Sequence, residues 1–193
     1  LEAPPGLRLP SGWDGFEIAV RAVIGQQVSV AAARTLTARL AQRHGTPLPV
    51  AFDGLTHLFP TPDRLADVDL TEIGLTRARA DTIRGLSRAL LEGRVDFNPE
   101  RTLEDFTSRW VALPGIGPWT AHYMALRALG HPDAFPADDL VLQKAVPTDG
   151  VRMTAKALAA RAEAWRPWGA YAVIHVWKGS MAAAKPPAVV GAT

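Results

Sequence analysis

Apolar residues recur every three or four positions along most of this chain, which is the spacing of one buried face of an α-helix. The first clear example lies in residues 13–25, where the aromatic and aliphatic positions fall on one side of a helical projection. These positions are Phe16, Ala19, Val20, Val23 and Ile24. The pattern therefore predicts a helix in this segment, with that face turned toward a core.

The same periodicity predicts further helices, several of which carry a start or stop signal. Ser29, Thr76 and Thr154 precede apolar-periodic runs and are suited to accept a backbone N–H as N-caps. Gly45 and Gly93 follow such runs, and we expect Gly45 to end its helix in the left-handed conformation. The expected helices cover residues 30–44, 61–68, 77–92, 102–113, 118–129, 138–146, 154–165 and 168–179.

Residues 45–62 are rich in proline and glycine and are predicted to form a connection. No alternating pattern of useful length predicts a strand, and no internal repeat is evident. The fold class is therefore expected to be all-α. The small and proline-containing residues 183–193 are predicted to form a flexible tail.

Composition narrows the classes of protein that fit this pattern. The 193 residues include 48% apolar residues, but no apolar run approaches the length of about 18 that a membrane span needs. The absence of cysteine excludes disulfides, thiolate metal sites and cysteine nucleophiles, and fits the interior of a reducing cell. The chain begins with Leu1 and shows no signal segment, so we expect a fragment of a longer protein.

The net charge is weakly positive, +2 from 21 basic and 19 acidic residues, and the basic residues are mostly arginine. Such a balance permits contact with a polyanion without requiring it, because local patches determine phosphate affinity. The five histidines show no paired spacing typical of a catalytic metal site.

The stretch LPGIGPWTAHY, residues 113–123, is the most distinctive motif. A dinucleotide-binding loop would need a third small residue where Thr120 stands and a strand before it, and the preceding segment is predicted to be helical. What remains is a helix, a tight glycine turn and a second helix, with Pro118 at the first helical position. Such a turn can present free amides to a phosphate, although a plain corner between two helices has the same spacing.

This motif also carries a resemblance to a known family. LPGIGPWTAHYMALRALG, followed by FPADDLVLQKA, resembles the helix-hairpin-helix and downstream aspartate of the helix-hairpin-helix (HhH-GPD) DNA glycosylase superfamily. GLRLPSGWDGFEIAVRAVIGQQVSVAAA and WRPWGAYAVIHVW resemble matching segments of the 3-methyladenine DNA glycosylase II, or AlkA, type. The resemblance covers residues 6–177.

The resemblance implies two helical lobes around a DNA-binding cleft, without the β-rich N-terminal domain of the AlkA type. One lobe would comprise residues 14–131, with the helix-hairpin-helix at about 103–129. The other would comprise residues 1–13 and 132–182. The implied activity is the excision of alkylated purines such as 3-methyladenine and 7-methylguanine from duplex DNA, by base flipping and hydrolysis of the N-glycosidic bond.

The acidic pair in PADDL is the candidate for this chemistry. Cleavage of an N-glycosidic bond develops positive charge on the sugar, which a fixed carboxylate stabilises. We expect Asp138 to cap the following helix and Asp139 to lie in its first turn, although capping alone would explain either residue. The resemblance selects Asp139 as the catalytic residue.

Three aromatic residues are candidates for the pocket that receives the extruded base. Trp119 and Tyr123 lie four positions apart on one helical face, and Trp177 comes from the last predicted helix. The resemblance assigns all three to base binding, where they would attract a cationic alkylpurine, whereas on pattern alone they would fill a core. Family members with lyase activity have a lysine at the position of Trp119, so the resemblance implies a monofunctional enzyme.

The resemblance also assigns residues that grip and distort the duplex. Gln27 takes the position of the wedge that fills the space left by the extruded base, where the AlkA type often has leucine, and an ordinary exposed glutamine is the alternative. The amides of Gly115, Gly117 and Thr120 would bind phosphate. Leu140 stands where an aromatic residue is common, which affects the expected substrate range.

No cofactor is implied as a requirement. The family's hairpin holds a monovalent cation, sodium or potassium, through main-chain carbonyls. In this chain those would belong to Val111, Leu113 and Ile116. Such oxygens suit hard cations.

The expected partner is double-stranded DNA containing alkylated bases, bound by a monomer with no membrane contact, in the cytoplasm at the bacterial nucleoid. The alternative is a non-catalytic module that binds damaged DNA, for example the C-terminal part of a fused alkylation-response regulator. Asp139 among aromatic residues separates the two hypotheses, because a module that only binds DNA does not need that carboxylate.

Overall fold

The computed structural model describes residues 6–146 and 151–183. By its internal contacts the chain divides into two compact units, and each is considered by itself. The large unit is Pro10–His131, and the small unit combines Leu1–Leu9 with Pro132–Thr193. Apart from residue 183, which ends the last helix, the predicted flexible tail lies outside the described residues.

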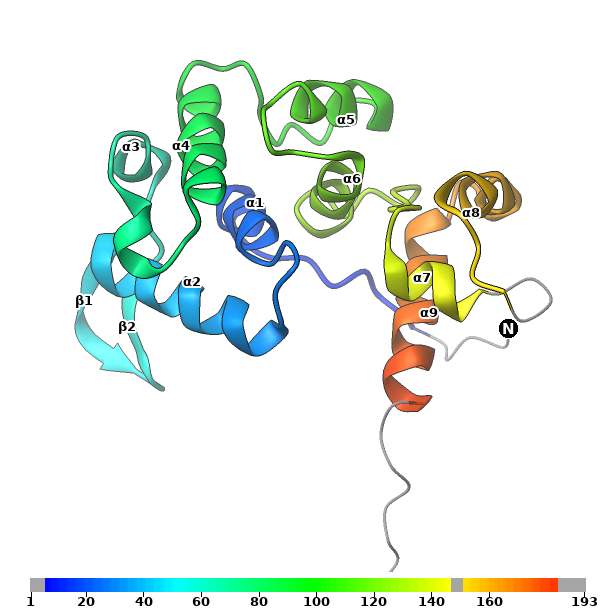
Figure 1. Ribbon diagram of the computed structural model, residues 1–193, viewed down its shortest axis with the longest axis horizontal. Coiled ribbons are helices and arrows are strands. Elements are labelled where there is room, and N and C mark those ends of the chain that lie inside the picture. Colours follow the sequence, from blue (N-terminus) through cyan, green and yellow to red (C-terminus); the bar gives the residue numbers. More distant parts are fainter. Residues whose placement is uncertain (1–5, 147–150, 184–193) are drawn as a thin grey trace, which may run out of the picture. The chain divides into compact units, whose positions relative to one another are not determined.

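Helices account for most of the described residues in both units, as predicted (Figure 1). The large unit contains α1 (Gly15–Ile24), α2 (Val30–His44), β1 (Thr46–Phe52), β2 (Leu55–Leu58), α3 (Pro62–Leu65), the 3-10 turn η1 (Leu70–Ile73), α4 (Arg77–Leu91), α5 (Leu103–Val111) and α6 (Pro118–Arg127). The small unit contains α7 (Leu140–Ala145), α8 (Ala155–Ala162), the 3-10 turn η2 (Glu163–Trp165) and α9 (Gly169–Ala183).

Helix α1 lies at the centre of the large unit and packs against α2, α4 and α6 (Figure 1). All the apolar positions that predicted this helix are buried, which confirms the predicted face. Asp14 caps the helix, since its side chain accepts the amide of Glu17. The burial of so apolar a helix supplies hydrophobic stabilisation to every element that surrounds it.

The predicted threonine and serine caps are confirmed. Ser29 accepts the amide of Ala32 at 3.2 Å, and Thr154 accepts the amide of Ala157 at 3.2 Å. Thr76 accepts the amide of Arg79 at 3.4 Å and begins α4. Each cap contributes about 1 kcal/mol to the stability of its helix.

The predicted connection at residues 45–62 is wrong in part, because β1 and β2 pair there as an antiparallel ribbon. Thr46 lies opposite Leu58, and Phe52 lies opposite Leu55. Almost every position of both strands is exposed, so neither face has a hydrophobic partner. Leu48, Val50 and Phe52 alternate along β1, but Pro47 and Pro49 interrupt the run, and proline in a run argues against a strand, which is why the sequence pattern did not reveal the ribbon.

The prediction that Gly45 ends α2 in the left-handed conformation is also wrong, because its backbone is extended at φ −75° and ψ 175°. A Cβ at this position would collide with the carbonyl oxygens of Ala41 and Leu58. Glycine is needed here because the end of α2 and the start of the ribbon pass too close for a side chain.

An aromatic cluster anchors the start of α5. The rings of Phe97, Phe106 and Trp110 pack with centroids 4.9 to 6.2 Å apart, and Phe106 and Trp110 are fully buried. The indole of Trp110 donates to the carbonyl of Asp96, whose carboxylate binds Arg101. This cluster holds the helix that leads into the glycine motif.

None of the helices in the described part of the chain has the length and hydropathy required to cross a bilayer.

Candidate functional site

The glycine hairpin, defined here as residues 113–118, joins α5 to α6. Gly115 has φ 84°, in the left-handed region that glycine adopts without strain, as the motif predicts. Gly117 does not need that freedom, since its backbone is extended at φ −94° and ψ 173°. It is the N-cap of α6, and it provides no side chain to cap that helix.

In the described part of the chain, some amides of the hairpin and of the first turn of α6 have no protein acceptor. Pro118 occupies the first position of α6 and has no N–H, as predicted. Within residues 6–146 and 151–183, the N–H groups of Gly115, Gly117 and Thr120 donate to no protein acceptor. Free amides at a helix start form a site for an anion such as a phosphate.

The close fit of the hairpin against α4 explains why Gly115 has no side chain. A Cβ at Gly115 would overlap the hydroxyl oxygen of Thr82 and lie within 3.0 Å of its other side-chain atoms. The Thr82 hydroxyl donates to the carbonyl of Ala78 at 2.9 Å, so this side chain is fixed within α4. Gly115 is thus required both by its backbone conformation and by this contact.

The turn between α1 and α2 presents Gln27 to solvent. Its φ of 55° places a non-glycine residue in the left-handed region, which costs about 1–3 kcal/mol. The neighbouring Gln26 points the other way, and its side-chain amide donates to the carbonyl of Gly115 at 3.2 Å and to the hydroxyl of Thr120 at 3.1 Å. The candidate wedge is therefore tied to the hairpin through Gln26, a residue that the sequence reasoning missed.

The carbonyls predicted to hold a cation lie at the end of α5 and in the hairpin. Among the described residues no donor reaches the carbonyl of Val111, the last residue of α5. The carbonyl of Leu113 accepts the amide of Ile116 at 3.1 Å and keeps a second lone pair. Carbonyl oxygens with spare lone pairs fit a hard monovalent cation.

Trp119 and Tyr123 stack on one face of α6, with ring centroids 5.1 Å apart and planes inclined by 18°. Both rings are partly exposed rather than buried in the core. Tyr123 also lines a hollow of about 260 Å³ in the large unit together with Trp13, whose side chain is fully exposed. Trp119 and Tyr123 therefore do not simply fill the core of the large unit.

Asp139 lies at the start of α7, and its environment differs from the prediction. Asp139 itself is the N-cap, and its Oδ1 accepts the amides of Val141 and Leu142, each at 2.9 Å. The prediction that Asp138 caps the helix is wrong, and Asp138 is exposed. The helix starts one residue later than expected, since Asp139 keeps an extended backbone at ψ 121°.

The carboxylate of Asp139 is also held by α9. The indole Nε1 of Trp177 donates to Oδ1 of Asp139 at 3.3 Å, and Asp139 is only 8% exposed. Three donors on one oxygen fix the carboxylate in place. The structure thus brings together Asp139 and Trp177, which are far apart in the sequence.

The loop before Asp139 is held by a residue that sequence reasoning did not identify. The side chain of Gln143 is 6% exposed and donates to the carbonyl of Ala137 at 3.0 Å. The backbone N–H of Gln143 donates to the carbonyl of Asp139 at 3.0 Å. A buried glutamine in a short helix has no spacing signature, so only the structure reveals that it steadies the aspartate.

The predicted site residues thus form two groups. The hairpin amides, Gln27 and the stack of Trp119 and Tyr123 belong to the large unit, while Asp139 and Trp177 belong to the small unit.

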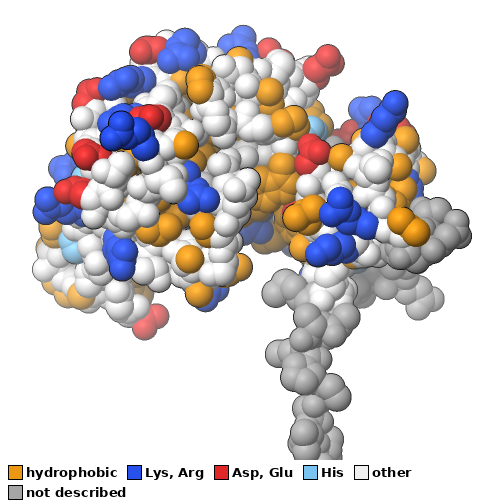
Figure 2. All heavy atoms as spheres, viewed as in Figure 1, with side chains coloured by type: hydrophobic (Ala, Val, Ile, Leu, Met, Phe, Trp, Pro, Cys, Tyr) orange, Lys and Arg blue, Asp and Glu red, His pale blue; other side chains and the backbone are white. Residues whose placement is uncertain are grey.

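Charge is mixed on the face of the large unit that Figure 2 shows. The basic residues of this unit are all arginines, and on that face they are interspersed with acidic residues. Many form ion pairs, among them Arg21 with Glu17, Arg88 with Asp67 and Arg101 with Asp96. Phosphate affinity would therefore depend strongly on the hairpin amides rather than on net charge.

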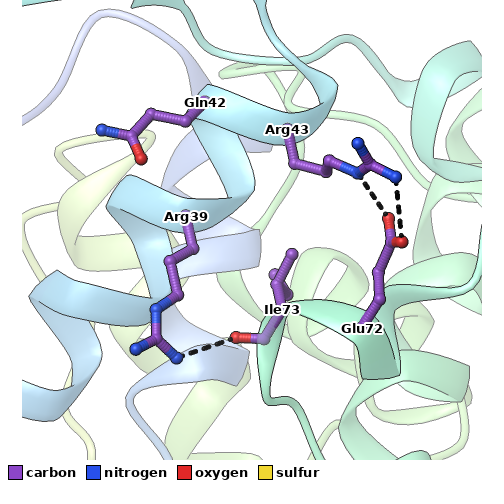
Figure 3. Close-up of a pocket in the computed structure, with 5 residues that line it drawn as sticks. All are labelled: Arg39, Gln42, Arg43, Glu72 and Ile73. Carbon is purple, nitrogen blue, oxygen red and sulfur yellow. Dashed lines mark hydrogen bonds and ion pairs between the residues drawn. The ribbon is translucent and has the colours of Figure 1, made fainter.

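A hollow of about 410 Å³ beside α2 shows two arginines that are bonded within the unit (Figure 3). Arg43 forms a two-pronged ion pair with Glu72, and Arg39 donates to the carbonyl of Ile73. Both arginines are therefore engaged within the unit. The described residues also contain no group of three or more His, Asp or Glu side chains arranged to hold a metal ion.

The fold, the glycine hairpin and the buried aspartate agree with a comparison of sequences. Residues 20–170 match the HhH-GPD superfamily of base excision DNA repair proteins, and this chain belongs to that superfamily. The resemblance read from its motifs is confirmed.

The similar proteins include 3-methyladenine DNA glycosylases. The chain is 41% identical over 178 residues to DNA-3-methyladenine glycosylase 2 of Escherichia coli, covering 91% of this chain and 61% of that protein. It is 40% identical over 173 residues to the probable bifunctional transcriptional activator/DNA repair enzyme AlkA of Mycobacterium tuberculosis, covering 90% of this chain and 35% of that protein.

A solved structure shows the same fold. The 3-methyladenine DNA glycosylase of Archaeoglobus fulgidus superposes with a TM-score of 0.74 at 26% identity, covering 92% of this chain and 62% of that one. The chain thus spans less than two thirds of each of these proteins.

Proposed function

We propose that this chain excises alkylated purines, of the 3-methyladenine and 7-methylguanine type, from duplex DNA. It acts as a monomer on a nucleotide that has been flipped out of the helix, and it hydrolyses the N-glycosidic bond. Membership of the superfamily and the names of the similar glycosylases support the reaction class. The single observation that carries the proposal is the fixed, buried carboxylate of Asp139.

The role of Asp139 follows from its surroundings. As the bond between C1′ and the base nitrogen breaks, its electron pair leaves with the base and the sugar becomes oxocarbenium-like. A carboxylate already held by two amides and the Trp177 indole stabilises that positive charge without reorganising. Water then adds to C1′ and loses a proton to the solvent.

The aromatic residues receive the flipped base. An extruded base loses its stacking in the duplex, and aromatic faces replace it. Trp119 and Tyr123 offer such a face from one helix, and Trp177 offers a second next to Asp139. A purine alkylated on a ring nitrogen is cationic, so these rings attract it more strongly than a normal base.

The large unit grips the strand. The free amides of Gly115, Gly117 and Thr120 bind a phosphate, and the exposed Gln27 enters the duplex as the wedge. The carbonyls of Val111, Leu113 and Ile116 would hold a sodium or potassium ion. When bound, that ion adds positive charge beside the phosphate.

The proposed enzyme is monofunctional. A lyase step needs an amine that forms a Schiff base with C1′, and the indole of Trp119 stands at the position of that amine in the lyase members of the family. Borohydride added during the reaction should therefore trap no covalent complex between protein and DNA, whereas a trapped complex would show that the chain has lyase activity.

The central test is the release of bases from methylated duplex DNA, identified by chromatography, for the wild type and for Asp139→Asn. Asparagine keeps the N-cap, since its side-chain oxygen accepts the same amides, so the fold should persist. Loss of the negative charge should lower the rate of base release by about 10²-fold or more. Asp138→Asn is the matched control, and it should release bases at the wild-type rate.

Binding of a duplex that carries an abasic-site analogue completes the test. Asp139→Asn should bind this duplex within about threefold of the wild type, because the hairpin and wedge are unchanged. Undiminished base release by Asp139→Asn would refute its catalytic role. Tight binding of the analogue by a wild type that releases no base would instead indicate the non-catalytic module.

A further inference from the structure

Gln26 makes contacts that none of the assigned roles requires. A glutamine side chain has two N–H donors, and both are used within the large unit, one on the carbonyl of Gly115 and one on the hydroxyl of Thr120. These partners lie 89 and 94 positions away in the sequence. One side chain thus connects the turn between α1 and α2 to the glycine hairpin at Gly115 and to the first turn of α6 at Thr120.

The backbone of Gln26 is held from a third direction. The guanidinium of Arg79, in the first turn of α4, donates to the carbonyl of Gln26. The amide of Gln26 donates to the carbonyl of Val23 at 3.2 Å, which continues α1 into the turn. Gln26 is therefore fixed through its amide, its carbonyl and its side chain.

The position of Gln26 matters because of its neighbours. Gln27 follows directly, with its left-handed backbone and exposed side chain. The carbonyl that Gln26 binds belongs to Gly115, whose amide is one of the free donors of the hairpin. A movement of the hairpin thus moves Gln27 as well, as long as the Gln26 bonds persist.

We infer that Gln26 is a positioning residue, which sets the wedge Gln27 in register with the phosphate held by the hairpin. This inference rests on the proposed function for the roles of Gln27 and of the hairpin amides. Both side-chain donors of Gln26 are engaged within the large unit, so its role is to hold the wedge rather than to contact DNA. Gln26 acts by holding Gln27 in position when the hairpin binds a phosphate.

The test replaces Gln26 with residues of similar length. Gln26→Met keeps the shape and removes the donors, and Gln26→Glu adds a carboxylate that repels the carbonyl oxygen of Gly115. Gln42→Met is the matched control, since Gln42 is exposed on α2 and is drawn without a bond to its labelled neighbours (Figure 3). Thermal unfolding of each variant shows whether it is folded at the temperature of the assay.

The readout is the ratio of two affinities, for a duplex with an abasic-site analogue and for the same duplex undamaged. Losing two hydrogen bonds should lower this ratio by about tenfold in Gln26→Met, and by more in Gln26→Glu. Affinity for undamaged duplex should stay within about twofold, because it reports the phosphate contacts. Gln42→Met should match the wild type in both measurements. An unchanged ratio, or an equal loss of both affinities, would overturn the positioning role.

A double variant identifies the path of the effect. Thr120→Val removes the hydroxyl that Gln26 binds and keeps the backbone amide. The combination of Gln26→Met with Thr120→Val should lower the affinity ratio no further than Gln26→Met alone, since both remove the same contact. Additive losses would show that Gln26 does not act through Thr120.

Arg79 needs a separate control, because arginine can also bind DNA directly. Arg79→Met should lower the affinity ratio and leave the salt dependence of undamaged-duplex binding unchanged. A direct phosphate contact would instead reduce the slope of log K against log salt by about 0.9, and would contradict the anchoring role. These binding measurements do not depend on catalysis, so they test the inference even for a wild type that releases no base.

Discussion

The large unit makes nearly the same turn twice, and the two turns differ in how the helix that follows is capped. Gly74 and Gly115 both have positive φ, 97° and 84°. Each is followed by a buried aliphatic residue, Leu75 or Ile116, with 4% of its surface exposed. In both turns the next residue is the N-cap of a helix.

The difference lies in that cap. Thr76 accepts an amide of α4 with its own hydroxyl, so the start of that helix is partly satisfied from within. Gly117 brings no side chain to α6, and among the described residues the amide of Thr120 has no protein acceptor. The backbone frame is therefore shared, and a single side chain decides whether the third amide of the helix is capped from within or is left for an outside acceptor.

The glycines offer the largest predicted effect in this comparison. Gly74→Ala should cost about 1–2 kcal/mol of unfolding free energy, the strain of a left-handed alanine, since its Cβ would only touch Arg39 and Leu36 at 3.4 and 3.5 Å. Gly115→Ala should cost about 2–5 kcal/mol, because overlap with Thr82 adds to the same strain. Urea denaturation of both variants measures the difference.

A second substitution checks the cause. Thr82→Ala removes the hydroxyl and methyl that the new Cβ would meet, so it should restore part of the stability lost in Gly115→Ala. Equal costs for the two alanine variants, or no recovery in the double variant, would show that the hairpin does not pack closely against Thr82 of α4.

Changing the N-cap residues should have an intermediate effect on stability, and the sign of that effect should differ between the two turns. Gly117→Ser has room for its side chain, since nothing lies within 4 Å of a Cβ there. It should stabilise α6 by roughly a few tenths of a kcal/mol. It should also lower duplex affinity several-fold, because the new hydroxyl competes with phosphate for the amides. Thermal unfolding and fluorescence anisotropy at fixed salt give the two values.

Thr76→Ala is the counterpart, and it should destabilise the protein by about 1 kcal/mol with unchanged duplex affinity. Reduced affinity in Thr76→Ala would mean that the first turn also contacts DNA. Undiminished affinity in Gly117→Ser would mean that the amides of α6 do not.

The smallest expected effect is a pH-dependent change in the free energy of unfolding, and it comes from the acidic residues that precede each turn. Arg101 lowers the pKa of Asp96 to about 2 through a hydrogen bond, ahead of the hairpin, while the hydroxyl of Thr71 lowers the pKa of Asp69 ahead of the other turn. Because the folded pKa of Asp96 lies below the unfolded value of about 3.9, its contribution is present above that pH and is lost as pH falls toward 2.

Asp96→Asn should therefore be less stable than the wild type at pH 6, by no more than about 1 kcal/mol for such an exposed pair. The difference should shrink below pH 4 and vanish near pH 2. Urea denaturation of both proteins from pH 6 to pH 2 follows it, and a difference that does not vary with pH would contradict the role of the ion pair.

Much of the fold could be predicted because its signals are local. The face of α1 follows from helical spacing, and the starts of α2, α4 and α8 follow from Ser29, Thr76 and Thr154, which bond amides three residues away. The ribbon of β1 and β2 was missed because the short alternation of Leu48, Val50 and Phe52 is interrupted by Pro47 and Pro49, which favour a connection in sequence.

The site was harder to predict where its residues act over long distances. The acidic pair was located from the motif, but the choice of cap between Asp138 and Asp139 depended on a backbone angle that spacing does not reveal. Gln143 and Gln26 carried no signal, because the sequence does not show whether a glutamine side chain bonds to the protein or to solvent.

By itself, the sequence determined most of the helices, the caps Ser29, Thr76 and Thr154, the turn made by Gly115 and the family to which the chain belongs, because each depends on residues close together in the chain. Only the tertiary structure decided that Gln26 binds Gly115 and Thr120, and that the Trp177 indole binds Asp139. Those contacts form between segments that packing brings together, and no local pattern records which distant partner a polar side chain will find.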